Sequence, residues 1–332
     1  MQRRTLIQCT VIGLAGGLTA GLASLSAHAQ GAWPTGKAIT YVVPFPPGGN
    51  TDTLARLVAQ PLSNALGTPV VIDNKGGAGG SVGSAIASRA PADGYTVLGG
   101  TISSHSINGS LYPTPIGYDM VKSFTPIAML GVSPLLLVVP ANSPIRTLDD
   151  VLKASRAKNG GLSSGSPGIG TSPHMALELL SYQSGVKFTH APYKGSAPAV
   201  QDVLSGQLDM MFDTSLIVGP HIQSGRLRAI AITGSQRLPG YPNVPTIAES
   251  GQKGFDMVSW QAMFVPANTP QAVVDRLHAE VMKVLAQPEV QAKLKGFGME
   301  PSSMTPAQLL EYQKTEVDKW AKVIKAANIK AE

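Results

Sequence analysis

Cysteine is almost absent from this chain. Among 332 residues the only cysteine is Cys9, which lies in an N-terminal segment that we expect to be removed. The remaining chain then has no disulfide, no thiol nucleophile and no thiolate metal site. The sequence also lacks an H-E-x-x-H motif, and no two of its later histidines lie at metal-ligand spacing on one helix. We therefore expect neither a metal nor a cofactor.

The chain also has only a small excess of positive over negative charge. Lysine and arginine number 26 against 20 acidic residues, a net charge of +6, and no run of basic residues stands out. This excludes the concentrated basic patch of a nucleic-acid-binding protein, so we expect no nucleic-acid partner. A weakly positive surface helps to attract anionic solutes, although net charge says little about a particular site.

The first 29 residues have the pattern of an export signal. Arg3 and Arg4 form a basic start, residues 6–25 are apolar, and Ala27-His28-Ala29 fits a cleavage site. The mature chain would begin at Gln30 in the periplasm, and loss of two arginines would lower the net charge from +6 to +4. The arginine pair fits the general Sec route and, loosely, the twin-arginine route, and both stay open.

From residue 38 onward, short β-like runs alternate with amphipathic segments. This alternation predicts βα units with mainly parallel sheets, and hence an α/β fold. The expected strands are 39–44, 70–73, 96–99, 188–191, 209–213 and 228–233. The expected helices are 51–66, 81–90, 148–158, 172–185, 198–206, 216–225, 270–285, 288–297 and 305–327.

Two long extended segments, 127–140 and 257–266, interrupt the alternation. Both end in a similar phrase, Val-Pro-Ala-Asn followed by Ser-Pro or Thr-Pro. We interpret them as two crossings between lobes, with 30–131 and 256–332 forming one lobe and 132–255 the other. The alternative of two ordinary core strands stays open.

Two glycine-rich turns, 44–50 and 165–171, each lead into a helix start. Glycine lets backbone N–H groups approach a ligand closely. The first turn of a helix leaves N–H groups unpaired and carries partial positive charge. The two turns together predict that helix starts hold one small anion from opposite sides. At the first turn the alternative is an ordinary strand-to-helix connection.

These stretches, in this order, resemble the Bug-type extracytoplasmic solute receptors of tripartite tricarboxylate transporters. The similarity covers nearly all of the mature sequence. It is carried by residues 43–52 (VPFPPGGNTD), 77–83 (GAGGSVG), 93–98 (DGYTVL), His174, 192–199 (PYKGSAPA) and 244–251 (VPTIAESG).

The resemblance implies a type II periplasmic-binding-protein fold, with two lobes joined by two crossing segments and a cleft between them. It also implies a monomeric, non-catalytic protein that binds a small organic carboxylate through backbone amides and ordered water and delivers it to inner-membrane transporter subunits. The ligand-binding residues that it implies come from the two turns, the loop after the third strand and one strand end. They are Phe45, Gly48, Gly49, Thr51, Asp52, Thr101, Ser103, Ser166, Gly170, Thr171, Ser172, His174 and Asp213.

Several of these assignments have alternatives. His174 either donates to a carboxylate or caps or packs against its own helix. Asp213 either accepts from a ligand amine or water or caps the next helix. Pro167 stands where a small residue is more usual and donates no N–H, which puts the amide geometry of the second turn in question. Lys194 is expected in solvent.

Two other functions compete with transport. One is a solute sensor of the same fold that docks on a receptor kinase. The other is an exported esterase, because Gly161-Leu162-Ser163-Ser164-Gly165 matches G-x-S-x-G. That motif needs a sharp turn directly into a helix, and the expected helix starts about nine residues later. The sequence leaves the identity of the carboxylate open.

Overall fold

Two groups of βα units lie side by side in the computed structural model, which describes residues 33–331. The export signal expected in residues 1–29 lies outside the described residues. The first group has a parallel sheet in the order β2-β1-β3. Its elements are β1 (Ile39–Val43), α1 (Asn50–Leu66), β2 (Val70–Asn74), η1 (Ala78–Gly80), α2 (Ser81–Ala87), β3 (Thr96–Thr101), η2 (Ser103–Ile107) and α3 (Asn108–Leu111).

The second group repeats the pattern around the parallel order β7-β5-β6. Its elements are α4 (Leu148–Ala157), β5 (Leu162–Ser166), α5 (Ser172–Ser184), β6 (Phe188–Pro192), α6 (Ser196–Leu204), β7 (Met210–Thr214), α7 (Ser215–Gln223) and β8 (Leu227–Ile232). The expected alternation of strands and helices is therefore present in both groups.

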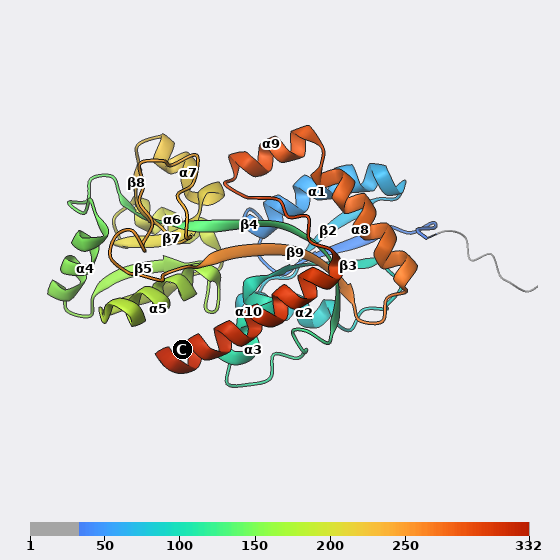
Figure 1. The fold of residues 1–332 in the computed structure, drawn as a ribbon, viewed down its shortest axis with the longest axis horizontal. Helices are drawn as coiled ribbons and strands as arrows, with labels where there is room; N and C mark the ends of the chain where they lie inside the picture. Colours follow the sequence, from blue (N-terminus) through green and yellow to red (C-terminus); the bar gives the residue numbers. More distant parts are fainter. Residues whose placement is uncertain (1–32, 332) are drawn as a thin grey trace, which may run out of the picture.

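Two long strands, β4 (Phe124–Pro140) and β9 (Val258–Pro266), run between the groups and pair antiparallel with each other. Figure 1 shows them crossing the middle of the molecule together. β9 also pairs with β3, and the second half of β4 pairs with β7 and β8. All nine strands thus form one sheet, which is parallel within each group and antiparallel where the long strands enter.

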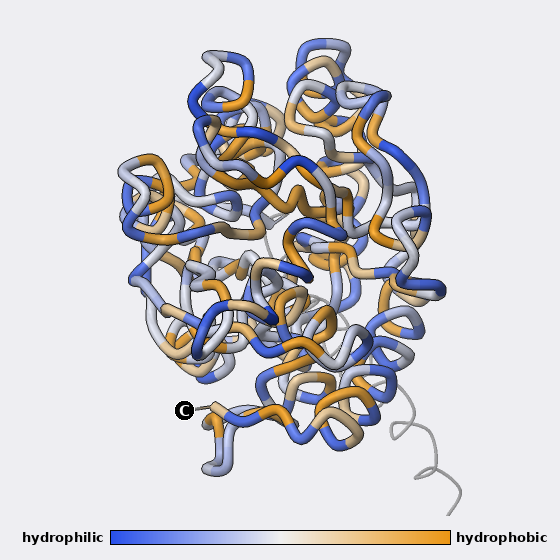
Figure 2. The backbone as a smooth tube through the Cα atoms, turned by 90° about the vertical axis from the view of Figure 1, so that its left-hand side faces the viewer, coloured by the Kyte–Doolittle hydropathy of each residue, from blue (hydrophilic) through white to orange (hydrophobic). Residues whose placement is uncertain are grey.

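The long strands are almost entirely buried, and helices pack against β4. Residues 135–139 of β4, Leu-Leu-Leu-Val-Val, are all fully buried. Helix α1 buries Leu54, Val58 and Leu62 along one face, as their spacing predicts. Each such side chain contributes roughly 1.5–3 kcal/mol when it is fully buried. Figure 2 shows apolar segments gathered in the interior and hydrophilic ones at outer turns.

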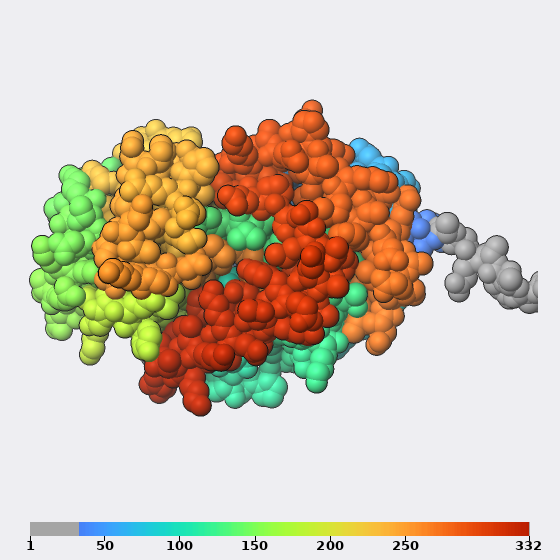
Figure 3. Space-filling model, viewed as in Figure 1, coloured from blue at the N-terminus to red at the C-terminus, as the bar shows by residue number. Residues whose placement is uncertain are grey.

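Three helices end the chain: α8 (Gln271–Leu285), α9 (Pro288–Gly296) and α10 (Pro306–Ala327). Helix α10 contacts η2, β4 and α5, so it touches both groups, and Figure 3 shows it lying over this face of the molecule. Trp320 and Ile324 anchor it, and Gln313 Nε2 donates to the carbonyls of His105 and Met120. No helix within residues 33–331 has the length and apolar character needed to cross a membrane.

Candidate binding site

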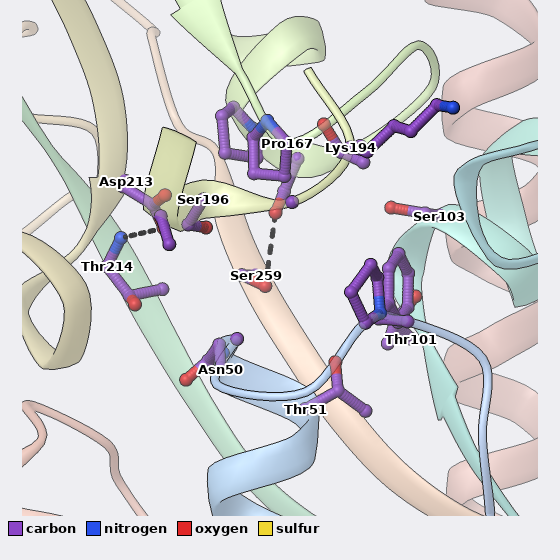
Figure 4. A pocket seen from close by; sticks show the side chains of 18 of the residues that line it. Asn50, Thr51, Thr101, Ser103, Pro167, Lys194, Ser196, Asp213, Thr214 and Ser259 are labelled. Atoms are coloured by element: carbon purple, nitrogen blue, oxygen red, sulfur yellow. Dashed lines mark hydrogen bonds between the residues drawn. The ribbon is translucent and has the colours of Figure 1, made fainter. Parts of the chain in front are cut away.

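A cavity of about 200 Å³ lies between the two groups of βα units. The first group contributes the turn after β1 and the end of β3, and the second contributes the starts of several helices. Strand β9 supplies the wall between them. Figure 4 shows these side chains converging. The cavity is lined by Phe45, Pro46, Pro47, Gly49, Asn50, Thr51, Thr101, Ser103, Pro167, Thr171, Ser172, Pro173, Lys194, Gly195, Ser196, Ala197, Pro198, Asp213, Thr214, Ser259 and Gln261.

Most of the residues singled out from the sequence line this cavity, although they are far apart in the chain. Those in the lining are Phe45, Gly49, Thr51, Thr101, Ser103, Thr171, Ser172 and Asp213. The others are not part of the lining: Gly48, Asp52, Ser166, Gly170 and His174.

The first turn is held by Asp52. Its carboxylate accepts from the Gly48 amide at 2.9 Å, from Arg56 Nε at 3.0 Å and from Asn74 Nδ2 at 3.0 Å. Burial alone would raise the pKa of Asp52, but these donors outweigh it and hold the pKa below its usual value. Asp52 is therefore an ionised group with its oxygens occupied, and it positions the turn from behind.

Gly48 and Gly49 have different roles in this turn. Gly48 has φ +81°, a conformation that favours glycine. Gly49 has φ −81°, which any residue adopts, and it is the N-cap of α1. A Cβ on Gly49 would meet only the Pro46 carbonyl, at 3.7 Å, so the fold has room for a side chain there. Gly49 lines the cavity, so a side chain at this position would take up cavity space.

The second turn is braced by two stacked histidines. The rings of His174 and His190 lie 4.0 Å apart. His174 Nδ1 accepts from the Gly170 amide at 3.1 Å, and His190 Nε2 lies 2.6 Å from Ser166 Oγ. Burial, with a smaller effect of His174, lowers the pKa of His190 to about 3, so His190 is neutral. His174 is only 4% exposed and fits the alternative of a histidine packed against its own helix.

Pro167 does not disorganise this turn. Its carbonyl accepts from the Gly195 amide at 3.0 Å, which ties the turn to the start of α6. The Thr171 hydroxyl donates to the Gly168 carbonyl at 2.6 Å and closes the turn on itself. The proline ring lines the cavity, so the amides available to a ligand on this side belong to α5 and α6.

Three helices present their first residues to the cavity. They are α1 at Asn50 and Thr51, α5 at Ser172, and α6 at Ser196. None of the three has a side-chain N-cap hydrogen bond. By contrast, α4 and α10, which begin elsewhere, have complete capping boxes, although α8 and α9 are also uncapped. The cavity thus faces several unpaired N–H groups and the positive ends of three helix dipoles.

Asp213 stands at the start of a fourth helix, α7. Its Oδ1 accepts from the Thr214 amide at 2.8 Å, while its Oδ2 has no hydrogen-bond partner among residues 33–331. Burial raises the pKa of Asp213 to about 6, despite the opposing effects of the nearby Ser196 hydroxyl and the Thr214 amide. Asn50 Oδ1, Thr214 Oγ1 and Gln261 Oε1 are likewise buried without a partner in the described residues.

Among the described lining residues, only Asp213 and Lys194 are ionisable. Lys194 is exposed, and Figure 4 shows its side chain pointing away from the cavity, in agreement with the expected solvated lysine. No group of three or more His, Cys, Asp or Glu side chains within residues 33–331 is arranged to hold a metal ion.

Sequence reasoning missed several lining residues. Ser196 follows a glycine at a helix start, like the residues of the two turns, and that signal could have found it. Ser259 and Gln261 lie two apart on β9, and so on the same face of the strand. The sequence does not show that this face meets a cavity. Asn50, within the first turn, and Thr214 were not singled out as ligand-binding residues.

Comparison with known proteins decides the family. The sequence model of the tripartite tricarboxylate transporter family receptor matches residues 54–329. This chain belongs to that family. The receptor is 35% identical over 314 residues to the protein BugT of Bordetella pertussis, covering 94% of this chain and 95% of BugT.

Solved structures agree with this assignment. The periplasmic binding protein BugD is 34% identical with TM-score 0.84, covering 89% of this receptor and 99% of BugD. A Rhodopseudomonas palustris protein with adipate is 36% identical with TM-score 0.86. The match covers 90% of this receptor and 99% of that protein. MatC from R. palustris with bound malate is 32% identical with TM-score 0.83. The match covers 87% of this receptor and 99% of MatC. The two-lobed periplasmic-binding-protein fold inferred from the sequence is confirmed.

The family consists of substrate-binding receptors and not of enzymes, as the resemblance implied. The competing esterase hypothesis also fails on the geometry of Ser163. That residue lies within strand β5, and its hydroxyl donates to Asp209 Oδ2 at 2.7 Å. Asp209 in turn pairs with Lys158. Ser163 is part of a polar cluster near the start of β5 and does not stand on a turn into a helix.

Proposed function

We propose that this receptor captures a small organic carboxylate in the cavity between its lobes. The observation that carries the proposal is the convergence of three uncapped helix starts on a cavity with no buried cation. Backbone N–H groups and helix dipoles bind an anion without the desolvation cost of a buried lysine or arginine. The adipate and malate bound to two similar structures are acids of this class.

The residues fall into two roles in this proposal. One set contacts the ligand. It consists of the eight residues that the resemblance implied and that line the cavity, together with Asn50, Ser196, Thr214, Ser259 and Gln261. Asp52, Gly48, Ser166, Gly170 and His174 position the two turns from behind. Residues 30–131 and 256–332 form one lobe and 132–255 the other, and ligand binding brings the lobes together.

The biological role extends this binding activity. The protein is exported by its N-terminal signal, through the Sec or twin-arginine route, and works as a monomer in the periplasm. The closed, loaded form is recognised by the inner-membrane subunits of a tripartite transporter. The membership of the receptor family supports this role.

A thermal-shift screen on refolded, ligand-stripped protein tests the binding proposal. Small carboxylates are compared with their methyl esters and amides, which keep the shape and lose the charge. At a free concentration near 100 times the dissociation constant, a true ligand stabilises the fold by about 2.7 kcal/mol. Equal stabilisation by an acid and its ester would rule out a site built for an anion.

A further inference from the structure

The cavity has two chemically different ends. Figure 4 shows Asp213, Ser196 and Thr214 on one side and Thr101 and Ser103 on the other. Asp213 is the only acid in the described lining, and it is 3% exposed. The start of α7, which would otherwise be a fourth anion-binding helix end, is already faced by its carboxylate. The start of α6 at Ser196 lies on the same side as Asp213, so the anionic end of a ligand belongs with the starts of α1 and α5.

The free oxygen of Asp213 needs a hydrogen-bond donor. A buried polar atom without a partner is rare in native proteins and costs about 1–3 kcal/mol. Asp213 Oδ2 is such an atom among residues 33–331: the Ser196 hydroxyl lies nearby without forming a hydrogen bond to it, and no cationic side chain of the described lining faces it, since Lys194 points outward. A ligand that placed a second carboxylate here would bind only if one of the two carboxyl groups took up a proton, and the cost of that protonation rises with pH.

We infer that this receptor selects carboxylates that also carry a hydrogen-bond donor, a hydroxyl or protonated amine, positioned to donate to Asp213 Oδ2. The inference rests on the proposed function and narrows its ligand class to hydroxy acids and amino acids. Asp213 is then the residue that determines specificity, and the helix starts supply affinity for the shared carboxylate.

Matched acids test this on the unmodified protein. Isothermal titration compares succinate, malate and aspartate, and then adipate, 2-hydroxyadipate and 2-aminoadipate, on refolded protein. Within each series only the donor changes. In at least one of the two series, we expect the acid with a hydroxyl or amine to bind at least ten times more tightly than the unsubstituted acid. Equal or tighter binding of succinate and adipate would overturn the inference and leave the carboxylate site intact.

An Asp213→Asn variant tests whether Asp213 causes the preference for acids that carry a hydroxyl or amine. It should reduce the tenfold preference to less than threefold, because the amide no longer offers a charged acceptor. Asp149→Asn, on the exposed surface of α4, removes the same charge far from the cavity and should keep the full preference. A preference that persists in Asp213→Asn overturns the assignment. If no carboxylate binds the unmodified protein, the proposed function fails and this inference with it.

Discussion

Asp52 and Asp213 are both buried aspartates, each 3% exposed, and their surroundings are opposite. Asp52, behind the first turn, accepts from three donors and its pKa is lowered. Asp213, on the wall of the other lobe, has one donor and one free oxygen, and its pKa is raised to about 6. The first carboxylate stabilises the fold, whereas the second is kept available at a cost in stability.

The comparison shows how one residue type serves structure in one lobe and recognition in the other. Functional sites commonly keep buried polar atoms without hydrogen-bond partners, and the stability of the rest of the fold compensates for their cost. Variants of the two aspartates separate these roles, and variants of the cavity wall and of the cleft test the site that Asp213 serves.

Gly49→Val should abolish binding while the protein stays folded. The backbone conformation of Gly49 suits any residue and its Cβ direction is open, so the new side chain enters the cavity instead of the core. We expect at least a hundredfold loss of carboxylate affinity by calorimetry. Gly240→Val is the matched control, because Gly240 is also open and is exposed away from the cavity. Normal binding by Gly49→Val would place the ligand elsewhere.

Asp213→Asn should stabilise the ligand-free protein at neutral pH. A carboxyl whose folded pKa is raised binds its proton more tightly when folded, so its ionisation costs stability as the pH rises from about 4 to 6. Two pKa units correspond to about 3 kcal/mol, which the asparagine variant should regain at pH 7.5. Urea unfolding at pH 4 should show little difference from the unmodified protein. A variant that is less stable at pH 7.5 would contradict the contrast between the two aspartates.

Asp52→Asn should do the opposite and destabilise the fold. Its charged oxygens accept from the Gly48 amide, Arg56 and Asn74, and loss of the charge weakens all three bonds. We expect a loss of about 2 kcal/mol at pH 7.5 by urea unfolding. Because the folded pKa of Asp52 is lowered, its contribution is present above the unfolded pKa and is lost as the pH falls through the folded pKa. The variant and the unmodified protein should converge in acid.

Tyr112→Phe should have the smallest effect and should act on lobe closure. The Tyr112 hydroxyl donates to the Ile169 carbonyl across the cleft at 3.2 Å, although Tyr112 does not line the cavity. Loss of this bond should cost the closed form about 0.5–1 kcal/mol and weaken binding two- to fivefold. Small-angle scattering at subsaturating ligand should show a larger mean radius of gyration for the variant. Unchanged affinity would mean that this contact does not contribute to closure.

The sequence by itself determined the fold class and the two turns that approach the cavity. The alternation of apolar runs and amphipathic helices, with Leu54, Val58 and Leu62 on one face of α1, is a local pattern that packing preserves. The long segments 127–140 and 257–266 stood out because they interrupt the alternation and end in similar phrases, and each forms one long strand of the sheet. Composition alone pointed to the two glycine-rich turns at helix starts, and the family resemblance then named Phe45, Gly49, Thr171 and Ser172 within them.

The tertiary structure decided which polar residues face the cavity. Asp52 and Asp213 are equally polar in sequence, and only the positions of Gly48, Arg56 and Asn74 make one of them structural. His174 follows the second turn closely, but the turn of α5 places its ring behind Gly170. Ser259 and Gln261 reach the cavity because β9 pairs with β3 and β4 between the lobes. Such roles depend on which segments meet in space, and a local sequence pattern does not contain that information.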